Sequence, residues 1–418
     1  MTKYHVNAII TKIKVYINNS LTAIEMYIHR SIEPELQRHI RLFNVTALVG
    51  PRQAGKTTLM RKQLESQSHS RYLSFDDPDV LALFDRDIKH FERQYLVAGG
   101  LTGLDEAHYG SDAGRKLKYL ADRGHRLIIS SSSELMLSRQ VLSQLVGRVG
   151  VIRLFPFSLA EFGQAAGLVE ATPAVKERLL WEHAAYGGYP KTALSPELED
   201  KRTILDSLYN TLLYKDVAQN FSITDLPGLE RLVRFLANNI GSLLSFQTAA
   251  GITGLSYPTL KKYLEALEKS YLIRLITPLS ANPNKEIVKQ PKTYFMDTGL
   301  RNAGLGQYPA SLADQGALFE NYVFTELLKL SVSLKYWRTK AGAEVDFVVQ
   351  TGQSLLPVEV KLRPGAMPSG LVSFIDNYHP ARALIVCSAG PATERKVNGC
   401  LVRTVPADLL AEEINAKS

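Results

Sequence analysis

The segment from residue 50 to residue 57 constrains the fold more than any other stretch of the chain. It reads Gly-Pro-Arg-Gln-Ala-Gly-Lys-Thr and matches the pattern G-x-x-x-x-G-K-[ST]. An apolar run typical of a strand, 45–49, precedes it, and a helical pattern, 58–64, follows it. Strand, glycine loop and helix together make a P-loop, in which backbone N–H groups surround a phosphate at the start of a helix. The sequence therefore predicts an α/β P-loop NTPase core; the alternative interpretation is a plain glycine turn.

Each residue of this loop is a candidate for ATP binding. Lys56 is expected to reach the β- and γ-phosphates, and the Thr57 hydroxyl is expected to hold Mg²⁺. ATP and Mg²⁺ are therefore the expected cofactors. The candidate ATP-binding residues are Gly50, Pro51, Arg52, Gln53, Ala54, Gly55, Lys56 and Thr57.

The second half of an ATPase site is predicted at residues 101–106. This mostly apolar segment ends in Asp105 and Glu106. Asp105 is expected to hold Mg²⁺ with its water shell, and Glu106 is expected to polarise the attacking water. Gly100 and Gly103 weaken the prediction of a strand, because glycine is poorly suited to strand interiors. The alternative is a solvated turn.

Two further catalytic candidates follow along the chain. A buried strand is predicted at 126–132 and runs into a serine cluster, from which Ser130 is the candidate for contacting the γ-phosphate or water. Arg148 is a candidate arginine finger that reaches the nucleotide of a neighbouring subunit. Its alternative role is that of a surface arginine without nucleotide contact. A finger acting between subunits predicts a homo-oligomer, formed at least when ATP binds.

Five segments together resemble a widespread prokaryotic family of AAA+-type ATPases. In that family the ATPase core is followed by a C-terminal domain with a restriction-endonuclease-like fold. The resemblance extends from Met26 to about Val405, with two departures: the family usually has Thr-Gly-Ser-Ser where this chain has four serines, and its strand before Asp-Glu is more uniformly apolar. The segments are 50–57, 104–106, the serines at 130–133, 145–148 and 154–162.

The chain of 418 residues is long enough for two to four domains. The first 25 residues lack the features of a signal peptide, and Met26 begins a stretch that reads like a normal start. Helical patterns lie at 175–185 and 201–217; the first of these also resembles the family, and the resemblance implies a lid over the nucleotide. The predicted parts are an upstream extension (1–25), an AAA+-type core (26–165), a helical lid (166–220), a winged-helix-like module (221–290) and a restriction-endonuclease-like domain (291–418).

The winged-helix prediction comes from the order of the predicted elements in one segment of the chain. An amphipathic helix is followed by a short helix capped by Ser245, a glycine turn, a helix at 257–269 and an apolar strand. If this module binds DNA, the second helix would present its polar side chains to the backbone or groove. The alternative is that the module only packs between domains. The candidate DNA-binding residues are Tyr257, Thr259, Lys261 and Lys262.

The last domain carries a pattern that looks like the D…E-x-K core of the PD-(D/E)xK nuclease superfamily. A predicted hairpin over 344–361 places Asp346 and Glu359 where both can point at one divalent metal, with Lys361 beside them. Glu320, on the preceding helix, matches a position that in the superfamily often adds a third carboxylate. Such carboxylates hold Mg²⁺, which activates a water, and the lysine helps to orient or deprotonate it. The alternative is an inactive nuclease-like scaffold that binds DNA or another chain.

Composition adds modest constraints on partners and location. A formal net charge of +8 favours a polyanionic partner such as nucleic acid. Cys387 and Cys400 lack metal-ligand spacing and are predicted to be free buried thiols, as in a reducing cytoplasm. No apolar run long enough to span a membrane occurs. The leading hypothesis is an ATPase that couples Mg-ATP hydrolysis to DNA binding or processing; the alternative is a nucleotide-dependent switch or scaffold acting on protein partners.

Overall fold

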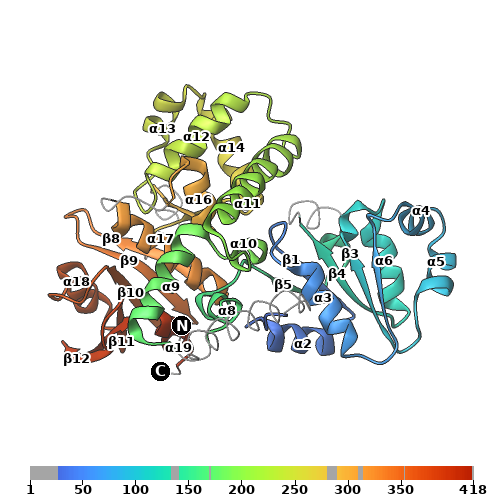
Figure 1. The fold of residues 1–418 in the computed structure, drawn as a ribbon, viewed down its shortest axis with the longest axis horizontal. Helices are drawn as coiled ribbons and strands as arrows, with labels where there is room; N and C mark the ends of the chain where they lie inside the picture. Colours follow the sequence, from blue (N-terminus) through green and yellow to red (C-terminus); the bar gives the residue numbers. More distant parts are fainter. Residues whose placement is uncertain are drawn as a thin grey trace, which may run out of the picture.

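The computed structural model describes residues 27–132, 141–168, 171–279, 290–308, 314–352 and 354–416. The predicted extension and Ser133 of the serine cluster lie outside these residues. Figure 1 shows three lobes, each coloured by its place in the chain: an N-terminal lobe, a helical lobe, and a C-terminal lobe. No helix among the described residues is both long and apolar enough to cross a membrane.

The N-terminal lobe is built on a parallel sheet of five strands in the order β2-β3-β4-β1-β5. All five residues of β1, an interior strand between β4 and β5, are buried, as expected of a strand covered on both faces. The strands are β1 (Val45–Val49), β2 (Ser70–Ser74), β3 (Leu101–Asp105), β4 (Arg126–Ser131) and β5 (Val149–Arg153).

Helices cover both faces of this sheet, so the predicted P-loop NTPase core is confirmed. Alternate residues of β1 face opposite sides: Leu48 packs with α2 and α3, whereas Val45, Ala47 and Val49 pack with α4, α5 and α6. These helices are α2 (Glu33–Leu42), α3 (Lys56–Glu65), α4 (Pro78–Arg86), α5 (Ile88–Tyr95) and α6 (Ala113–Asp122).

Two glycines that sequence reasoning noted have clear steric roles. Gly50, at the end of β1, has φ +152°, and a Cβ there would lie 2.0 Å from the Leu154 carbonyl oxygen. Gly103 lies inside β3, where a Cβ would come within 2.7 Å of the Met60 sulfur of α3. The glycine that weakened the strand prediction is therefore what lets α3 approach the sheet closely.

The middle of the chain is helical. The predicted helix 175–185 is present as α9, whereas the pattern at 201–217 forms α11 followed by a π-helix, η3, and not one continuous α-helix. A π-helix is rare and often lies at functional sites. The elements are α8 (Leu159–Ala165), α9 (Pro173–Tyr186), α10 (Pro190–Ala193), α11 (Leu198–Thr211) and η3 (Leu212–Gln219).

The helical lobe combines helices α12, α13, α14 and α16 with a two-stranded antiparallel sheet. The predicted cap at Ser245 is present, since its side chain accepts a hydrogen bond from Thr248 N, and α14 has the predicted bounds. The elements are α12 (Leu226–Asn238), α13 (Phe246–Thr253), α14 (Tyr257–Lys269), β6 (Ile273–Ile276), β7 (Lys292–Phe295) and α16 (Thr298–Leu305).

The C-terminal lobe is a six-stranded mixed sheet in the order β12-β13-β11-β10-β9-β8, with the long helix α17 packed against it. Strands β9 and β10 form the predicted hairpin. Cys387 and Cys400 are free and buried, as predicted. The elements are α17 (Gln315–Lys329), β8 (Ser333–Arg338), β9 (Glu344–Thr351), β10 (Ser354–Lys361), α18 (Ser369–Tyr378), β11 (Arg382–Cys387), β12 (Thr393–Val397), β13 (Cys400–Pro406) and α19 (Leu410–Asn415).

Candidate functional site

The P-loop joins β1 to α3 and wraps around the side chain of Lys56. Lys56 is buried, and its Nζ donates hydrogen bonds to the carbonyl oxygens of Gly50, at 2.9 Å, and Pro51, at 2.8 Å. Burial lowers the pKa of Lys56 to about 8. The buried ammonium therefore lies against the backbone of the loop, at the start of a helix whose first N–H groups are free to bind phosphate.

Asp105, at the end of β3, is the centre of a group of hydroxyl donors. Its Oδ2 accepts hydrogen bonds from Thr57 Oγ1, at 2.6 Å, and Tyr72 OH, at 2.8 Å. Its Oδ1 accepts one from Ser130. The structure thus brings together Thr57, Asp105 and Ser130, which lie on three separate segments of the sequence. Tyr72, which no motif indicated, belongs to the same group.

Glu106 follows Asp105 in an unusual backbone conformation. Its φ is 52°, a region that non-glycine residues seldom adopt and that is enriched at active sites. The carboxylate Oε2 accepts hydrogen bonds from Ser132 N at 3.0 Å and Ser132 Oγ at 3.2 Å, and lies 3.2 Å from His108 Nδ1. Burial lowers the pKa of His108. The backbone and these neighbours fix Glu106 at the carboxyl end of the sheet, beside the P-loop.

An ion pair links the P-loop to the π-helix η3. Sequence reasoning missed this ion pair. Arg52 Nε donates to Asp216 Oδ1 at 2.6 Å, and the Asp216 side chain is largely buried. Burial raises the pKa of Asp216. The nearby charge of Glu106 also raises this pKa, whereas the charges of Arg52 and Lys56 lower it. Asp216 is therefore a further acidic group beside the P-loop, contributed by the helical part of the chain.

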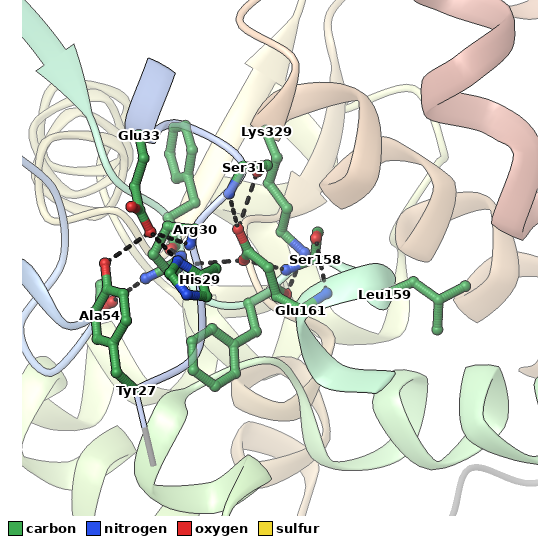
Figure 2. A network of polar contacts seen from close by, with 12 residues as sticks. Tyr27, His29, Arg30, Ser31, Glu33, Ala54, Ser158, Leu159, Glu161 and Lys329 are labelled. Atoms are coloured by element: carbon green, nitrogen blue, oxygen red, sulfur yellow. Dashed lines mark hydrogen bonds and ion pairs between the residues drawn. The ribbon is translucent and has the colours of Figure 1, made fainter. Parts of the chain in front are cut away.

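A buried arginine holds the other side of the P-loop, as Figure 2 shows. Arg30 Nη1 donates to the Ala54 carbonyl oxygen at 2.9 Å, and Nη2 donates to the Phe155 carbonyl oxygen at 2.6 Å. Arg30 Nε lies 3.1 Å from Glu161 Oε2, an ion pair that lacks ordinary hydrogen-bond geometry. Both side chains are almost fully buried. Arg30 therefore connects the loop to the segment after β5.

The same network continues into the C-terminal lobe (Figure 2). Glu161 forms a capping box with Ser158 at the start of α8. Next to it, Leu159 N donates to Glu326 Oε2 at 3.0 Å, and Lys329 Nζ donates to the Phe157 carbonyl oxygen at 2.8 Å. Glu326 and Lys329 belong to α17. A continuous set of polar contacts therefore leads from the P-loop to the C-terminal lobe.

Replacing Arg30 with methionine is expected to destabilise the protein by about 3 kcal/mol, because Glu161 would remain as an uncompensated buried charge. The measurement is the thermal midpoint of the nucleotide-free protein. Arg38→Met, on the exposed face of α2, is the matched control and should leave the midpoint unchanged. The double variant Arg30→Met/Glu161→Leu should recover part of the loss; an unchanged midpoint for Arg30→Met alone would contradict a structural role for the network.

A mostly apolar recess lies beside the P-loop, and no sequence motif indicated it. It is bounded by the first turns of α3, by the segment before α2 and by α10. Tyr27 is fixed at its rim, because its hydroxyl donates to Glu33 Oε1 at 2.8 Å. The lining residues are Tyr27, Ile28, Arg30, Gly55, Thr58, Leu59, Phe157, Pro190 and Leu194.

Arg148 lies at the opposite end of the sheet from the P-loop of its own chain. It directly precedes β5, whose first residue pairs with Val45 at the start of β1, whereas the P-loop follows the end of β1. Its Nε donates to Asp122 Oδ1 at 2.5 Å. Arg148 therefore belongs to a surface away from the local nucleotide site, and its role in a neighbouring subunit stays a prediction.

The candidate DNA-binding residues lie at the start of α14. Lys261 and Lys262 are exposed, and Lys261 Nζ lies 4.7 Å from the ring centroid of Tyr257, which is itself exposed. The Thr259 hydroxyl, in contrast, is hydrogen bonded to the capping residue Ser256. Tyr257 and Lys261, one helical turn apart, are thus accessible together, whereas Lys262 Nζ donates to the Ser222 carbonyl oxygen at 3.3 Å. Their contact with DNA stays a prediction.

The four nuclease candidates converge at the junction of α17, β9 and β10. Glu359 Oε1 accepts a hydrogen bond from Lys361 Nζ at 2.7 Å, and Asp346 Oδ2 accepts one from Val360 N at 2.8 Å. Burial raises the pKa of both carboxyl groups, and the nearby charge of Glu320 raises them further. Sequence spacing therefore placed Asp346, Glu359 and Lys361 correctly on adjacent strands, with Glu320 close by.

The cluster also contains a lysine that the nuclease pattern did not indicate. Lys292, on β7, has a buried side chain whose Nζ lies 3.1 Å from Glu320 Oε1 and 2.6 Å from Glu344 Oε1. Burial alone would lower the pKa of Lys292, but the surrounding carboxylates outweigh it and raise the pKa. Across the described ranges, no group of three or more His, Cys, Asp or Glu side chains is arranged to hold a metal ion. The predicted metal role of Glu320, Asp346 and Glu359 does not fit this arrangement, because an ammonium lies among the oxygens.

Three family models match successive parts of the chain. An AAA domain matches residues 42–163, and two domains of unknown function match 177–311 and 315–406. Among solved structures, a Walker-type ATPase of Pyrococcus abyssi has a TM-score of 0.46 at 16% identity and covers 67% of this chain and 97% of that one.

Uncharacterized proteins of bacteria and archaea are similar over much of their length. MJ1544 of Methanocaldococcus jannaschii is 24% identical over 327 residues, which is 73% of this chain and 72% of that protein. Rv2008c of Mycobacterium tuberculosis is 30% identical over 394 residues, 91% of this chain and 83% of that protein. The chain therefore belongs to the same family as Rv2008c, and its N-terminal part is a P-loop AAA-type ATPase domain.

Proposed function

We propose that this protein binds Mg-ATP and hydrolyses it, and that hydrolysis is coupled to the binding or processing of DNA. The observation that supports hydrolysis is the convergence of Lys56, Thr57, Asp105 and Glu106 at one end of the parallel sheet. These residues supply a phosphate-binding ammonium, oxygen donors for a hard cation and a carboxylate for proton transfer, which are the parts an NTP hydrolase needs.

The oxygen donors near Lys56 fit Mg²⁺. Thr57 Oγ1 and Asp105 Oδ2 are 2.6 Å apart, so both can face one ion or its water shell. When bound, Mg²⁺ neutralises charge on the phosphates and orients them. Lys56 binds the phosphate oxygens, while Ser130 keeps Asp105 oriented through its hydroxyl.

Glu106 is the proposed general base. Ser132 and His108 hold its carboxylate, so little reorganisation is needed before it accepts a proton from water. Arg148 of a neighbouring subunit is proposed to complete the site, which makes the active form a homo-oligomer. The recess lined by Tyr27 and Leu59 adjoins the first turn of α3, and we assign the nucleotide base to it.

DNA is proposed to bind through α14, with the helical lobe acting as a winged helix. The support is the exposed group of Tyr257, Lys261 and Lys262, since lysines neutralise phosphates and an aromatic ring can stack on a base. The net charge of +8 agrees with a polyanionic partner. The proposed domains are an ATPase core, a lid, a winged-helix module and a C-terminal domain. In this division the ATPase core hydrolyses ATP and the winged-helix module binds DNA.

Phosphate release from Mg-ATP is expected to rise when duplex DNA is added, and to stop when EDTA removes Mg²⁺. Replacing both Lys261 and Lys262 with glutamate should weaken DNA binding and lower the salt slope of the binding constant by about one for each phosphate that is no longer neutralised. Basal hydrolysis should remain. Fluorescence anisotropy with a labelled duplex, alongside the phosphate assay, measures both effects.

The matched control makes the same charge change elsewhere. Lys89→Glu/Arg93→Glu alters two exposed basic residues on α5, away from α14. If this control weakens DNA binding as much as the α14 variant does, binding depends on net charge and not on α14.

The second candidate function is a nucleotide-dependent switch or scaffold that acts on protein partners. The observation that favours it is Lys292, whose ammonium lies within the carboxylate cluster where a nuclease would need its metal. ATP hydrolysis with neither DNA stimulation nor DNA binding would support this function over the DNA-coupled one.

A further inference from the structure

We propose that Lys292 is the resident cation of the C-terminal carboxylate cluster, so that this cluster holds a lysine ammonium in place of a divalent metal ion. This inference concerns the nuclease-like end of the chain and does not depend on the ATP site. It accounts for the observation that, among the residues the structure describes, these carboxylates are not arranged to hold a metal ion.

The first step of the argument is the position of the ammonium. Lys292 Nζ lies 2.6 Å from Glu344 Oε1, 3.1 Å from Glu320 Oε1 and 3.9 Å from Asp346 Oδ1. Its side chain is only 3% exposed. A Mg²⁺ ion would need to lie about 2.0–2.1 Å from these same oxygens. An ion bound to all three oxygens would lie within about 5 Å of the ammonium, and the two positive charges would repel each other in this buried setting.

The second step is the balance of charge. Four carboxylates and three cationic groups form one connected set, so the cluster is close to neutral without any metal. Arg338 Nη1, 2.9 Å from Glu344 Oε2, and Lys361 Nζ, 2.7 Å from Glu359 Oε1, supply the other two cations. The members are Glu320, Glu344, Asp346, Glu359, Lys292, Lys361 and Arg338.

The third step is that Lys292 is fixed by its backbone. It belongs to β7, which pairs with β6 on one side and forms a bridge with Leu243 on the other. Two residues along the same strand, Tyr294 OH donates to Glu320 Oε1 at 2.6 Å. The backbone of Lys292 is therefore held in the sheet, and its side chain is buried among the carboxylates of the cluster.

Lys361 differs from Lys292 in its exposure and in its position at the cluster. Its side chain is 47% exposed, and it contacts Glu359 at the edge of the cluster. The other oxygen of that carboxylate, Glu359 Oε2, is buried and forms no hydrogen bond with any residue of the described ranges. Removal of the Lys292 ammonium would leave this oxygen and those of Glu320 and Asp346 as a set of hard donors, which suits Mg²⁺ or Mn²⁺.

The test measures Mn²⁺ binding to the full-length, nucleotide-free protein by electron paramagnetic resonance of the free ion. Wild-type protein should bind no Mn²⁺ at the cluster up to about 1 mM, the weak end of protein sites for hard cations. Lys292→Met should bind Mn²⁺ with a Kd at least about tenfold below this 1 mM limit, because the competing charge of the ammonium is gone. Asp346→Asn in the Lys292→Met background should abolish this binding, which locates it.

Lys361→Met is the matched control, because it removes the same charge from the edge of the cluster and should create no Mn²⁺ site. Lys292→Gln serves if Lys292→Met folds poorly, and Mn²⁺ should then raise the thermal midpoint of that variant. Two results would overturn the proposal: Mn²⁺ binding by wild-type protein that is lost in Asp346→Asn alone, or a folded Lys292 variant that gains no binding.

Discussion

Lys56→Ala is expected to weaken ATP binding by about 10³-fold, which corresponds to about 4 kcal/mol. The ammonium is lodged against the backbone of the P-loop through its contacts with the Gly50 and Pro51 carbonyl oxygens. Without it, the phosphates lose a charge-assisted contact in a buried setting, where such contacts are strongest. Calorimetric titration with Mg-ATP measures the effect.

The control for this variant is Lys62→Ala, on the same helix. Lys62 is exposed and forms a surface ion pair with Glu65, so its removal should leave ATP binding and stability nearly unchanged. Tight binding of ATP by Lys56→Ala would show that residues 50–57 do not form the nucleotide site. Loss of binding in both variants would instead indicate a defect in helix α3 as a whole.

Glu106→Gln is expected to retain ATP binding and to lower kcat by about 10²–10⁴-fold, the usual contribution of a positioned general base. The amide has nearly the same shape, and its oxygen can still accept the hydrogen bonds from Ser132. It cannot accept a proton from water. Phosphate release gives kcat, and the same calorimetric titration gives Kd.

Glu65→Gln, at the exposed end of α3, is the control and should change neither quantity. An unchanged kcat in Glu106→Gln would remove this residue from the chemistry and make Asp216, the other acidic group facing the loop, the next candidate. A large loss of binding in Glu106→Gln would mean that the carboxylate acts mainly in nucleotide binding.

The nucleotide site was largely predictable because its pattern is local. Eight consecutive residues determine the loop, and the parallel sheet brings the ends of β1, β3 and β4 to one edge. This is why Thr57, Asp105 and Ser130 lie together as expected. The bounds of α14 were also predictable, since Ser256 caps its start and its apolar residues follow a helical period.

The residues that the sequence did not reveal act across long separations. Arg30 contacts Phe155, and Asp216 contacts Arg52, through tertiary packing that no spacing rule encodes. Asp216 also lies on a π-helix, whose altered period an amphipathic pattern does not indicate. Lys292 belongs to a short β-strand far from the nuclease pattern, so its entry into the carboxylate cluster depends on the way two lobes meet.

Helix α17 connects the P-loop network with the C-terminal carboxylate cluster, because its two ends contact one each. Near its start, Glu320 accepts hydrogen bonds from Lys292 and Tyr294; at its end, Lys329 contacts the Phe157 carbonyl oxygen, two residues from the one that Arg30 holds. Glu320 and Lys329 lie on this one helix, about 14 Å apart along its axis. A shift of the peptide at Ala54 that moved or tilted α17 would therefore also displace the carboxylate of Glu320, which contacts the ammonium of Lys292.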